Sequence, residues 1–129
     1  MINKVRQETI INTLKTEVES IQLIILFGSA INAYFDPNRS DIDIAFLSSK
    51  QIGNVQRWEI QEKLASCLNS DIDLVDLNKS NDVLRFEVIS KGQTLFIKPS
   101  AKIERILDSI YINYIQLNED RAEIIQNYA

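Results

Sequence analysis

The sequence contains no histidine and a single cysteine, Cys67. The chain therefore has no imidazole to act as a general base or a zinc ligand, and one thiol forms neither an intramolecular disulfide nor a thiolate metal cluster. Any bound metal ion must be held by oxygen atoms. We expect Cys67 itself to be a small buried residue on a helix, because no histidine is present to activate it as a nucleophile.

Glycine and proline are also scarce, with three and two residues among 129, whereas apolar residues make up 45%. This composition argues against disorder, and a chain of this length fits one compact domain with its own core. No apolar run approaches the roughly 20 residues that span a bilayer, and the N-terminus lacks the pattern of a signal peptide. We expect a single cytoplasmic domain over residues 1–129.

Positive charge is in deficit, because 14 lysines and arginines face 18 aspartates and glutamates, for a formal net charge of −4. Proteins that bind a phosphate backbone broadly do so with clustered basic side chains. We therefore expect no direct binding of DNA or RNA. An acidic surface would instead suit a basic protein partner.

Apolar periodicity predicts alternating helices and strands. Helices are expected over about residues 3–20, 55–69, 82–90 and 100–129, with a turn or two of helix over 30–35, and strands over 23–27, 41–47, 71–77 and 93–98. The run over 23–27 is continuously apolar, as in a strand buried on both faces. Ser80 or Asn81 can cap the helix over 82–90. This order predicts a small mixed sheet covered by helices, an α/β or α+β domain.

Two short motifs flank the loop between the first two expected strands. Gly28-Ser29 ends the first strand, where glycine lets a phosphate approach the backbone and the serine hydroxyl can donate to it. Asp41 and Asp43 begin the second strand and project to the same side, about 6–7 Å apart at the backbone. Such a pair suits Mg²⁺, which takes one or two carboxylates and completes its shell with water and phosphate oxygens.

A third carboxylate is expected from the strand over residues 71–77. Alternation along this strand places Asp71 and Asp73 on one face and Asp76 on the other. We rank Asp73 first, since Asp71 lies at the start of the strand and Asp76 faces away. Asp71 and Asp76 remain alternatives.

Gly28-Ser29, the Asp41 and Asp43 pair and a third acidic strand, taken together in this order, are more specific than any one of these short motifs alone. A buried strand ends in Gly-Ser, eleven residues follow, Ser-Asp-Ile-Asp opens the next strand, and a third acidic strand comes after one helix. It resembles the nucleotidyltransferase superfamily related to DNA polymerase β. The small size resembles its minimal nucleotidyltransferases (MNT), the antitoxins found beside HEPN-domain ribonuclease toxins. The resemblance covers the core over residues 23–77 and implies a polymerase β palm-like fold.

The resemblance also implies a role for individual residues. Gly28 and Ser29 match the phosphate-binding pair, Asp41 and Asp43 match two ligands of a two-metal Mg²⁺ site, and Asp73 matches the third catalytic carboxylate. Many relatives have an arginine and a glycine shortly after Gly-Ser, where this chain has Asn32 and Ala33. Arg39 could compensate as a phosphate clamp, or could be a solvated loop residue.

The activity that the resemblance implies is transfer of AMP from ATP to a hydroxyl, in the family a tyrosine of the HEPN toxin, within a complex of the two proteins. Two alternatives remain open. The chain could neutralise its partner by covering it, with a vestigial site, or it could modify a small molecule. A tRNA acceptor fits the acidic charge least.

The remaining aromatic residues divide into two groups. Apolar surroundings predict core positions for six of them rather than adenine stacking: Trp58, Phe27, Phe35, Phe46, Phe86 and Phe96. Tyr34 could stack on a base or cover the loop. Tyr111, Tyr114 and Tyr128 lie among isoleucines of the C-terminal helical segment, over residues 100–129, which could form either a protein interface or part of the core.

Overall fold

The computed structural model describes residues 2–31, 36 and 41–128. Several residues singled out above lie outside these ranges: Asn32, Ala33, Tyr34, Phe35 and Arg39. The end of the helical turn expected over residues 30–35 lies outside them as well. Its beginning is a 3₁₀ helix, η1 (Gly28–Ile31).

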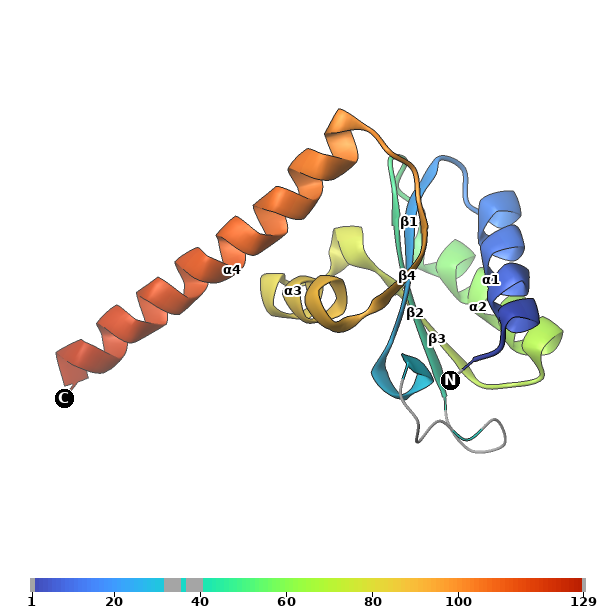
Figure 1. Ribbon diagram of the computed structural model, residues 1–129, viewed down its shortest axis with the longest axis horizontal. Coiled ribbons are helices and arrows are strands. Elements are labelled where there is room, and N and C mark those ends of the chain that lie inside the picture. Colours follow the sequence, from blue (N-terminus) through green and yellow to red (C-terminus); the bar gives the residue numbers. More distant parts are fainter. Residues whose placement is uncertain (1, 32–35, 37–40, 129) are drawn as a thin grey trace.

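Four strands form one mixed sheet, as the alternation of elements predicted (Figure 1). They are β1 (Ile21–Phe27), β2 (Ile42–Ser48), β3 (Ile72–Asp76) and β4 (Gln93–Ile97). The spatial order is β3-β2-β1-β4, in which β2 and β3 run parallel and the other pairs antiparallel. The central strand β1 is buried along its first six residues, as expected for a strand covered on both faces.

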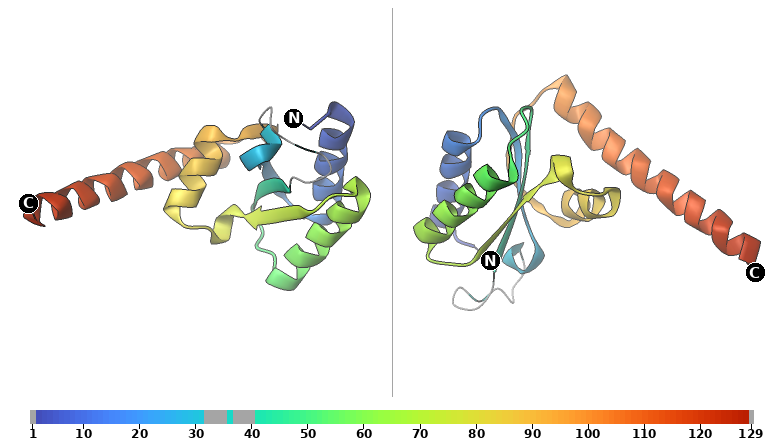
Figure 2. Two further views of the ribbon diagram at one scale, coloured as in Figure 1. Left: turned by 90° about the horizontal axis from the view of Figure 1, so that it is seen from below. Right: turned by 180° about the vertical axis from the view of Figure 1, so that it is seen from behind.

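Helices cover both faces of the sheet. One face carries α1 (Lys4–Glu17) and α2 (Asn54–Leu68), and the other carries α3 (Asp82–Lys91) and the first part of α4 (Ala101–Tyr128) (Figures 1 and 2). Asn81 caps α3, its Oδ1 accepting from the Leu84 amide at 2.8 Å, and Asn3 caps α1 in the same way. The helices thus begin at the polar residues that satisfy their first amides.

Alternation along β2 separates two apolar layers. Ile42, Ile44 and Phe46 pack beneath α1 and α2, whereas Ala45 and Leu47 pack beneath α3 and α4. Because successive side chains of a strand point to opposite faces, Asp43 lies on the α3 side. The end of that face carries carboxylates instead of apolar side chains.

Two expectations for α2 were wrong. Trp58 is 54% exposed and Cys67 is also exposed, although both were expected in the core. The helix buries Ile60, Leu64 and Leu68, one residue in every four, which makes a narrow stripe. Trp58 and Cys67 are not among the buried residues of this stripe. Of the other aromatic side chains within the described residues, Phe46 is fully buried, and Phe27, Phe86 and Phe96 are partly buried.

Within the described residues, no helix combines the length and the apolarity that crossing a bilayer requires.

Candidate active site

Gly28 brings the backbone directly against Asp43. Its φ of +65° lies in the left-handed region, which side chains other than glycine adopt reluctantly. A Cβ atom built at this position would overlap Asp43 Oδ2 and lie 3.3 Å from Asp43 Cγ. The turn therefore requires glycine both for its backbone conformation and for the space beside this carboxylate.

Ser29 connects the turn to the second motif. Its hydroxyl donates to the backbone carbonyl of Asp41 at 3.4 Å, a long and therefore weak hydrogen bond. Phe27 pairs with Asp43 across the antiparallel β1 and β2 ladder. The structure thus brings Gly28, Ser29, Asp41 and Asp43 to one end of the sheet, although they come from different elements.

The parallel pairing of β2 and β3 places Asp73 directly opposite Asp43. Asp73 is exposed on the same face as Asp43, as strand alternation predicted. Asp71 is exposed just before β3, and its carbonyl accepts from the Ile42 amide at 2.9 Å. Both aspartates therefore lie at the end of the sheet that bears the site.

Asp76 serves a structural purpose instead. It is only 5% exposed on the opposite face, and its Oδ1 accepts from the Asn78 amide at 3.0 Å, which caps the 3₁₀ helix η2 (Leu77–Lys79). Its Oδ2 is buried and has no hydrogen-bond partner among the residues that the structure describes. This geometry argues against Asp76 as the third carboxylate of the site.

The electrostatics of Asp43 reflect this crowding. Burial, and then the negative charges of Asp73 and Asp41, raise its pKa from 3.8 to about 6. Carboxylates that repel one another in this way favour the binding of a cation between them. The sign of the shift is therefore the one expected of a cation site.

The donor set fits a hard divalent cation, because it consists of carboxylate oxygens. Among the described residues, however, no three acidic, histidine or cysteine side chains converge closely enough to hold a metal ion on their own. Mg²⁺ usually takes only one or two protein carboxylates and completes its octahedron with water and phosphate oxygens. The arrangement therefore suits a metal ion that arrives with a phosphate ligand.

A cavity of about 300 Å³ adjoins Gly28 on the same face of the sheet. Its wall is largely apolar, with Phe27 and Ile31 on one side and Leu84 and Val88 of α3 on the other. Lys91 also lines it and pairs with Glu87 at 2.9 Å. Its volume is at the lower end of the range of small-molecule pockets, which begins at about 300 Å³.

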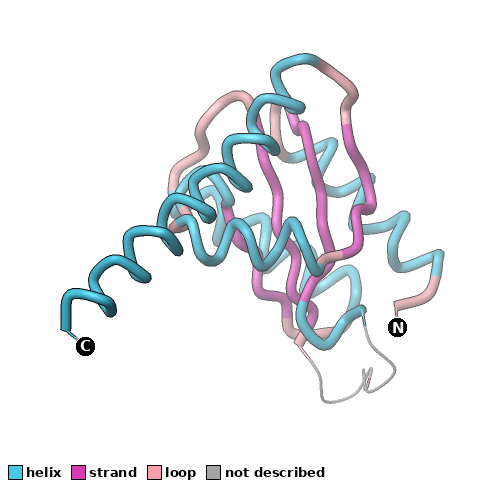
Figure 3. Tube along the Cα trace, turned by 60° about the vertical axis from the view of Figure 1, so that its left-hand side comes forward, coloured by secondary structure: helices cyan, strands magenta, loops and turns pink. Residues whose placement is uncertain are grey.

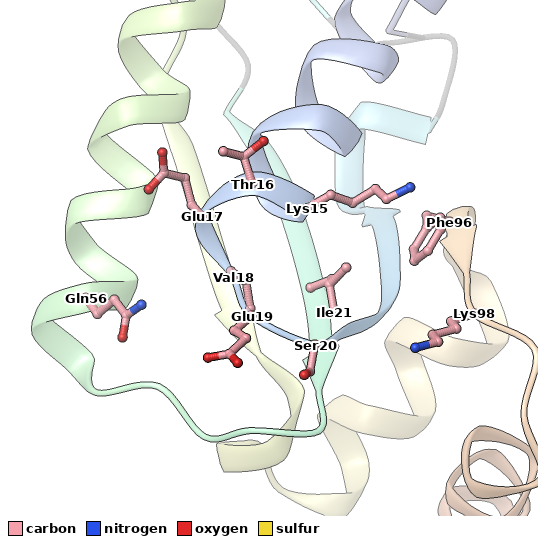
Figure 4. Close-up of a pocket in the computed structure, with 10 residues that line it drawn as sticks. All are labelled: Lys15, Thr16, Glu17, Val18, Glu19, Ser20, Ile21, Gln56, Phe96 and Lys98. Atoms are coloured by element: carbon pink, nitrogen blue, oxygen red, sulfur yellow. The ribbon is translucent and has the colours of Figure 1, made fainter.

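A larger hollow of about 770 Å³ lies at the opposite end of the sheet, where α1 ends and β1 begins (Figure 4). Lys15 extends over the ring of Phe96, 4.6 Å from its centroid, while Glu19 forms an ion pair with Lys50. The hollow lies where β1 begins, whereas Gly28 and Asp43 lie where β1 ends, so the length of the strand separates the hollow from the carboxylates. The hollow is not part of the candidate site.

Two side chains of α2 that were not predicted as contributors hold β3 in place. Gln61 Oε1 accepts from the Leu74 amide at 3.0 Å, and Arg57 Nη1 donates to the Leu74 carbonyl at 2.9 Å. Leu74 follows Asp73 on the outer strand of the sheet. The spacing of four residues between Arg57 and Gln61 is visible in the sequence, but it does not reveal the strand that they contact.

Known proteins share both the sequence pattern and the fold. The family described as "Polymerase beta, Nucleotidyltransferase" matches residues 8–101. The protein adenylyltransferase MntA of Shewanella oneidensis is 41% identical over 95 residues, which cover 74% of this chain and 68% of the relative.

Solved structures extend the similarity over the whole chain. A chain from the complex of a tri-AMPylated Shewanella oneidensis HEPN toxin with an MNT antitoxin has a TM-score of 0.79 at 35% identity, over 98% of both chains. A chain from a toxin–antitoxin structure with AMP-PNP has a TM-score of 0.82 at 37% identity, over 94% of this chain and 96% of that one.

Proposed function

The chain belongs to the polymerase β nucleotidyltransferase family, and we propose that it transfers AMP from ATP to a tyrosine hydroxyl of a HEPN-type toxin and thereby acts as an antitoxin. The observation that carries the proposal is the register of Asp43 opposite Asp73, with Gly28 against Asp43. The relatives support it, since one is named a protein adenylyltransferase and another was solved with a tri-AMPylated HEPN toxin.

In the proposed reaction, Asp41, Asp43 and Asp73 would hold Mg²⁺ together with the triphosphate. Bound Mg²⁺ would supply charge neutralisation at the phosphates. The backbone at Gly28 and the hydroxyl of Ser29 would contact phosphate oxygens, and Arg39, which lies outside the described residues, is proposed as a further phosphate contact. The toxin–antitoxin structure solved with AMP-PNP supports ATP as the donor.

The bond changes follow from this arrangement. The acceptor oxygen forms a bond to the α-phosphorus, the bond from that phosphorus to the pyrophosphate oxygen breaks, and the acceptor proton passes to a carboxylate. Asp73 is the proposed proton acceptor, because it is exposed at the site and the chain has no histidine. The need for ATP supports the expected cytoplasmic location.

The test is incubation of the chain and its partner toxin with Mg²⁺ and ATP labelled on the α-phosphate. We expect label on the toxin, and a loss of at least about 100-fold in labelling rate for Asp43→Asn and Asp73→Asn, the range seen when a transition-state contact is removed. Asp71→Asn is the matched control and should retain most of the rate. An unlabelled toxin, or full activity of Asp43→Asn, would contradict the proposal.

A second candidate function, neutralisation by covering the toxin, is favoured by the exposed apolar residues of α4. A double variant, Asp41→Asn with Asp43→Asn, distinguishes covering of the toxin from AMP transfer when it is expressed with the toxin in cells. Transfer of AMP predicts that this variant no longer protects the cells. Protection by the folded double variant would favour covering.

A further inference from the structure

One side of α4 is apolar along its described length except at Arg121, which follows Ile103 by five full turns and therefore lies on the same side of the helix. In the first half, Ile103 and Ile110 are buried, and Ile106 and Leu107 pack against the same core layer as α3. Tyr114 ends this packed half, with its ring stacked on Phe86 of α3 at a centroid distance of 3.8 Å. These residues recur at spacings of three and four, so they share one side of the helix.

The same side continues beyond the domain. At 100° per residue, Leu117, Ile124 and Ile125 extend the row of Ile103, Ile110 and Tyr114. We call these three residues the α4 ridge. Ile124 is 56% exposed and Ile125 is 69% exposed, and this half of α4 projects away from the rest of the molecule (Figures 1 and 2). An apolar row that packs on α3 thus runs on into solvent.

The ridge lies where a bound protein could reach the carboxylates. α4 is on the side of the sheet that α3 covers, which is also the side of Asp43 and Asp73. Figure 3 shows that α4 runs back from the far end of β4 toward the level of the sheet end that bears the site. A protein seated on the ridge would therefore approach the site from the open side.

A second copy of the chain is the weaker occupant. The free half of α4 over residues 115–126 is about 18 Å long and about 10 Å wide, far below the roughly 800 Å² per partner that a stable interface buries. An interface between two copies that involved the ridge alone would therefore bury too little area to be stable. An acceptor protein must also contact the active site, so its interface extends from the ridge to Asp43 and becomes large enough.

The net charge of the chain, −4, favours a partner of net positive charge over a second copy. Beyond Tyr114 the exposed charged residues of α4 are Glu119, Asp120, Arg121 and Glu123. Helical geometry places Arg121 within the row of the ridge and the three acidic residues away from it, so these side chains do not surround the ridge with negative charge. Like charges repel between two copies of this acidic chain, whereas a protein of opposite net charge would be attracted to it.

We propose that the α4 ridge is the docking surface for the protein that supplies the acceptor hydroxyl, through an apolar patch on that protein. The inference rests on the proposed function, because it takes the acceptor to be a protein. It adds the surface that brings the acceptor to the site, and thus places substrate recognition outside the catalytic residues.

The test compares Ile124→Gln combined with Ile125→Gln against the control Ile112→Gln. Ile112 is 64% exposed and lies on the opposite side of α4, so all three positions tolerate glutamine without loss of the core. We expect the double variant to bind the toxin at least about tenfold more weakly and to raise the KM for the toxin, with an unchanged affinity for a non-hydrolysable ATP analogue. The control should resemble wild type in all three.

Three results would overturn the inference: toxin binding and labelling by the double variant equal to wild type, an equal loss in the Ile112→Gln control, or conversion of the isolated chain from dimer to monomer with toxin affinity unchanged. Circular dichroism and thermal unfolding verify that the variants fold. Failure of the wild-type chain to label the toxin would instead contradict the proposed function, and the binding measurement would still test the ridge.

Discussion

Glycine at position 28 is required for two independent reasons, its positive φ and its contact with Asp43. For Gly28→Ala, we expect a loss of about 1–2 kcal/mol in the free energy of unfolding, because a side chain in the left-handed region is strained. We also expect a large loss of AMP transfer, since the new methyl group would displace the Asp43 carboxylate. Urea denaturation and the labelling assay measure the two effects.

Gly53→Ala is the matched control for this substitution. Gly53 has an extended backbone, and a Cβ atom there would meet no atom of the described part of the chain within 4 Å. We expect it to retain full activity. Equal activity of Gly28→Ala and Gly53→Ala would show that the backbone beside Asp43 has no part in phosphate binding.

The raised pKa of Asp43, about 6 as against 3.8 for an ordinary aspartate, predicts a pH dependence of stability. The folded, metal-free protein holds this proton to a higher pH than the unfolded chain does, so the stabilisation is complete below pH 4 and is lost as the pH rises through 6. Asp43→Asn mimics the neutral form. We expect it to be more stable than wild type at pH 7.5 and equally stable at pH 4, measured by urea denaturation in EDTA.

The same shift predicts that a proton and Mg²⁺ compete for Asp43, so the Mg²⁺ concentration needed for half-maximal transfer should rise as the pH falls below 6. A wild-type and Asp43→Asn stability difference that stays constant between pH 4 and 7.5 would contradict the assignment of this pKa.

At the scale of elements, the edge strand β3 depends on α2. For Gln61→Leu, we expect a loss of about 1–3 kcal/mol, since the Leu74 amide loses its acceptor. The rate of transfer should also fall, because Asp73 precedes Leu74 on this strand. Hydrogen exchange at the Leu74 amide, followed by NMR, should become faster.

Gln56→Leu is the control, since Gln56 is exposed on the same helix. It should leave exchange at Leu74 and the transfer rate unchanged. If Gln61→Leu behaved in the same way, the contact would not support β3.

Local patterns in the sequence predicted most elements and their order. Asn81 as a cap, alternation along β3 and the apolar run of β1 each depend on neighbouring residues alone, and all three were confirmed. Trp58 and Cys67 were misplaced because an apolar residue on a helix does not show how wide the buried stripe is. The contact of Gln61 with Leu74 depends on which strand lies at the edge of the sheet. Local patterns do not reveal this order of the strands.

At the scale of the whole molecule, the two apolar layers predict that a substitution lowers the free energy of unfolding much more in a buried layer than on the surface. Leu64 is fully buried beneath the sheet, so Leu64→Ala should lower the free energy of unfolding by about 2–5 kcal/mol. Trp58→Ala, on the same helix, should lower it by less than about 1 kcal/mol, because the ring is largely exposed. Denaturant unfolding measures both, and an equal loss would contradict the burial of α2 described above.

The sequence predicted only in part that the carboxylates of the site lie close together. Alternation placed Asp43 and Asp73 on consistent faces of their strands, but only the parallel pairing of β2 and β3 makes them neighbours. The role of Asp76 in capping η2 was likewise hidden, because it depends on a turn and not on strand alternation. The projection of α4 beyond the domain could not be inferred, since an apolar helix side looks the same whether it is covered or free.

The single thiol offers a practical consequence. Cys67 is exposed on α2, on the opposite side of the sheet from α4 and the carboxylates. A maleimide dye or a biotin linker attached there would form one defined conjugate without engineering any cysteine into or out of the chain. Fluorescence anisotropy or surface immobilisation through this position would leave the α4 side open, so that native toxin and nucleotide could be titrated directly.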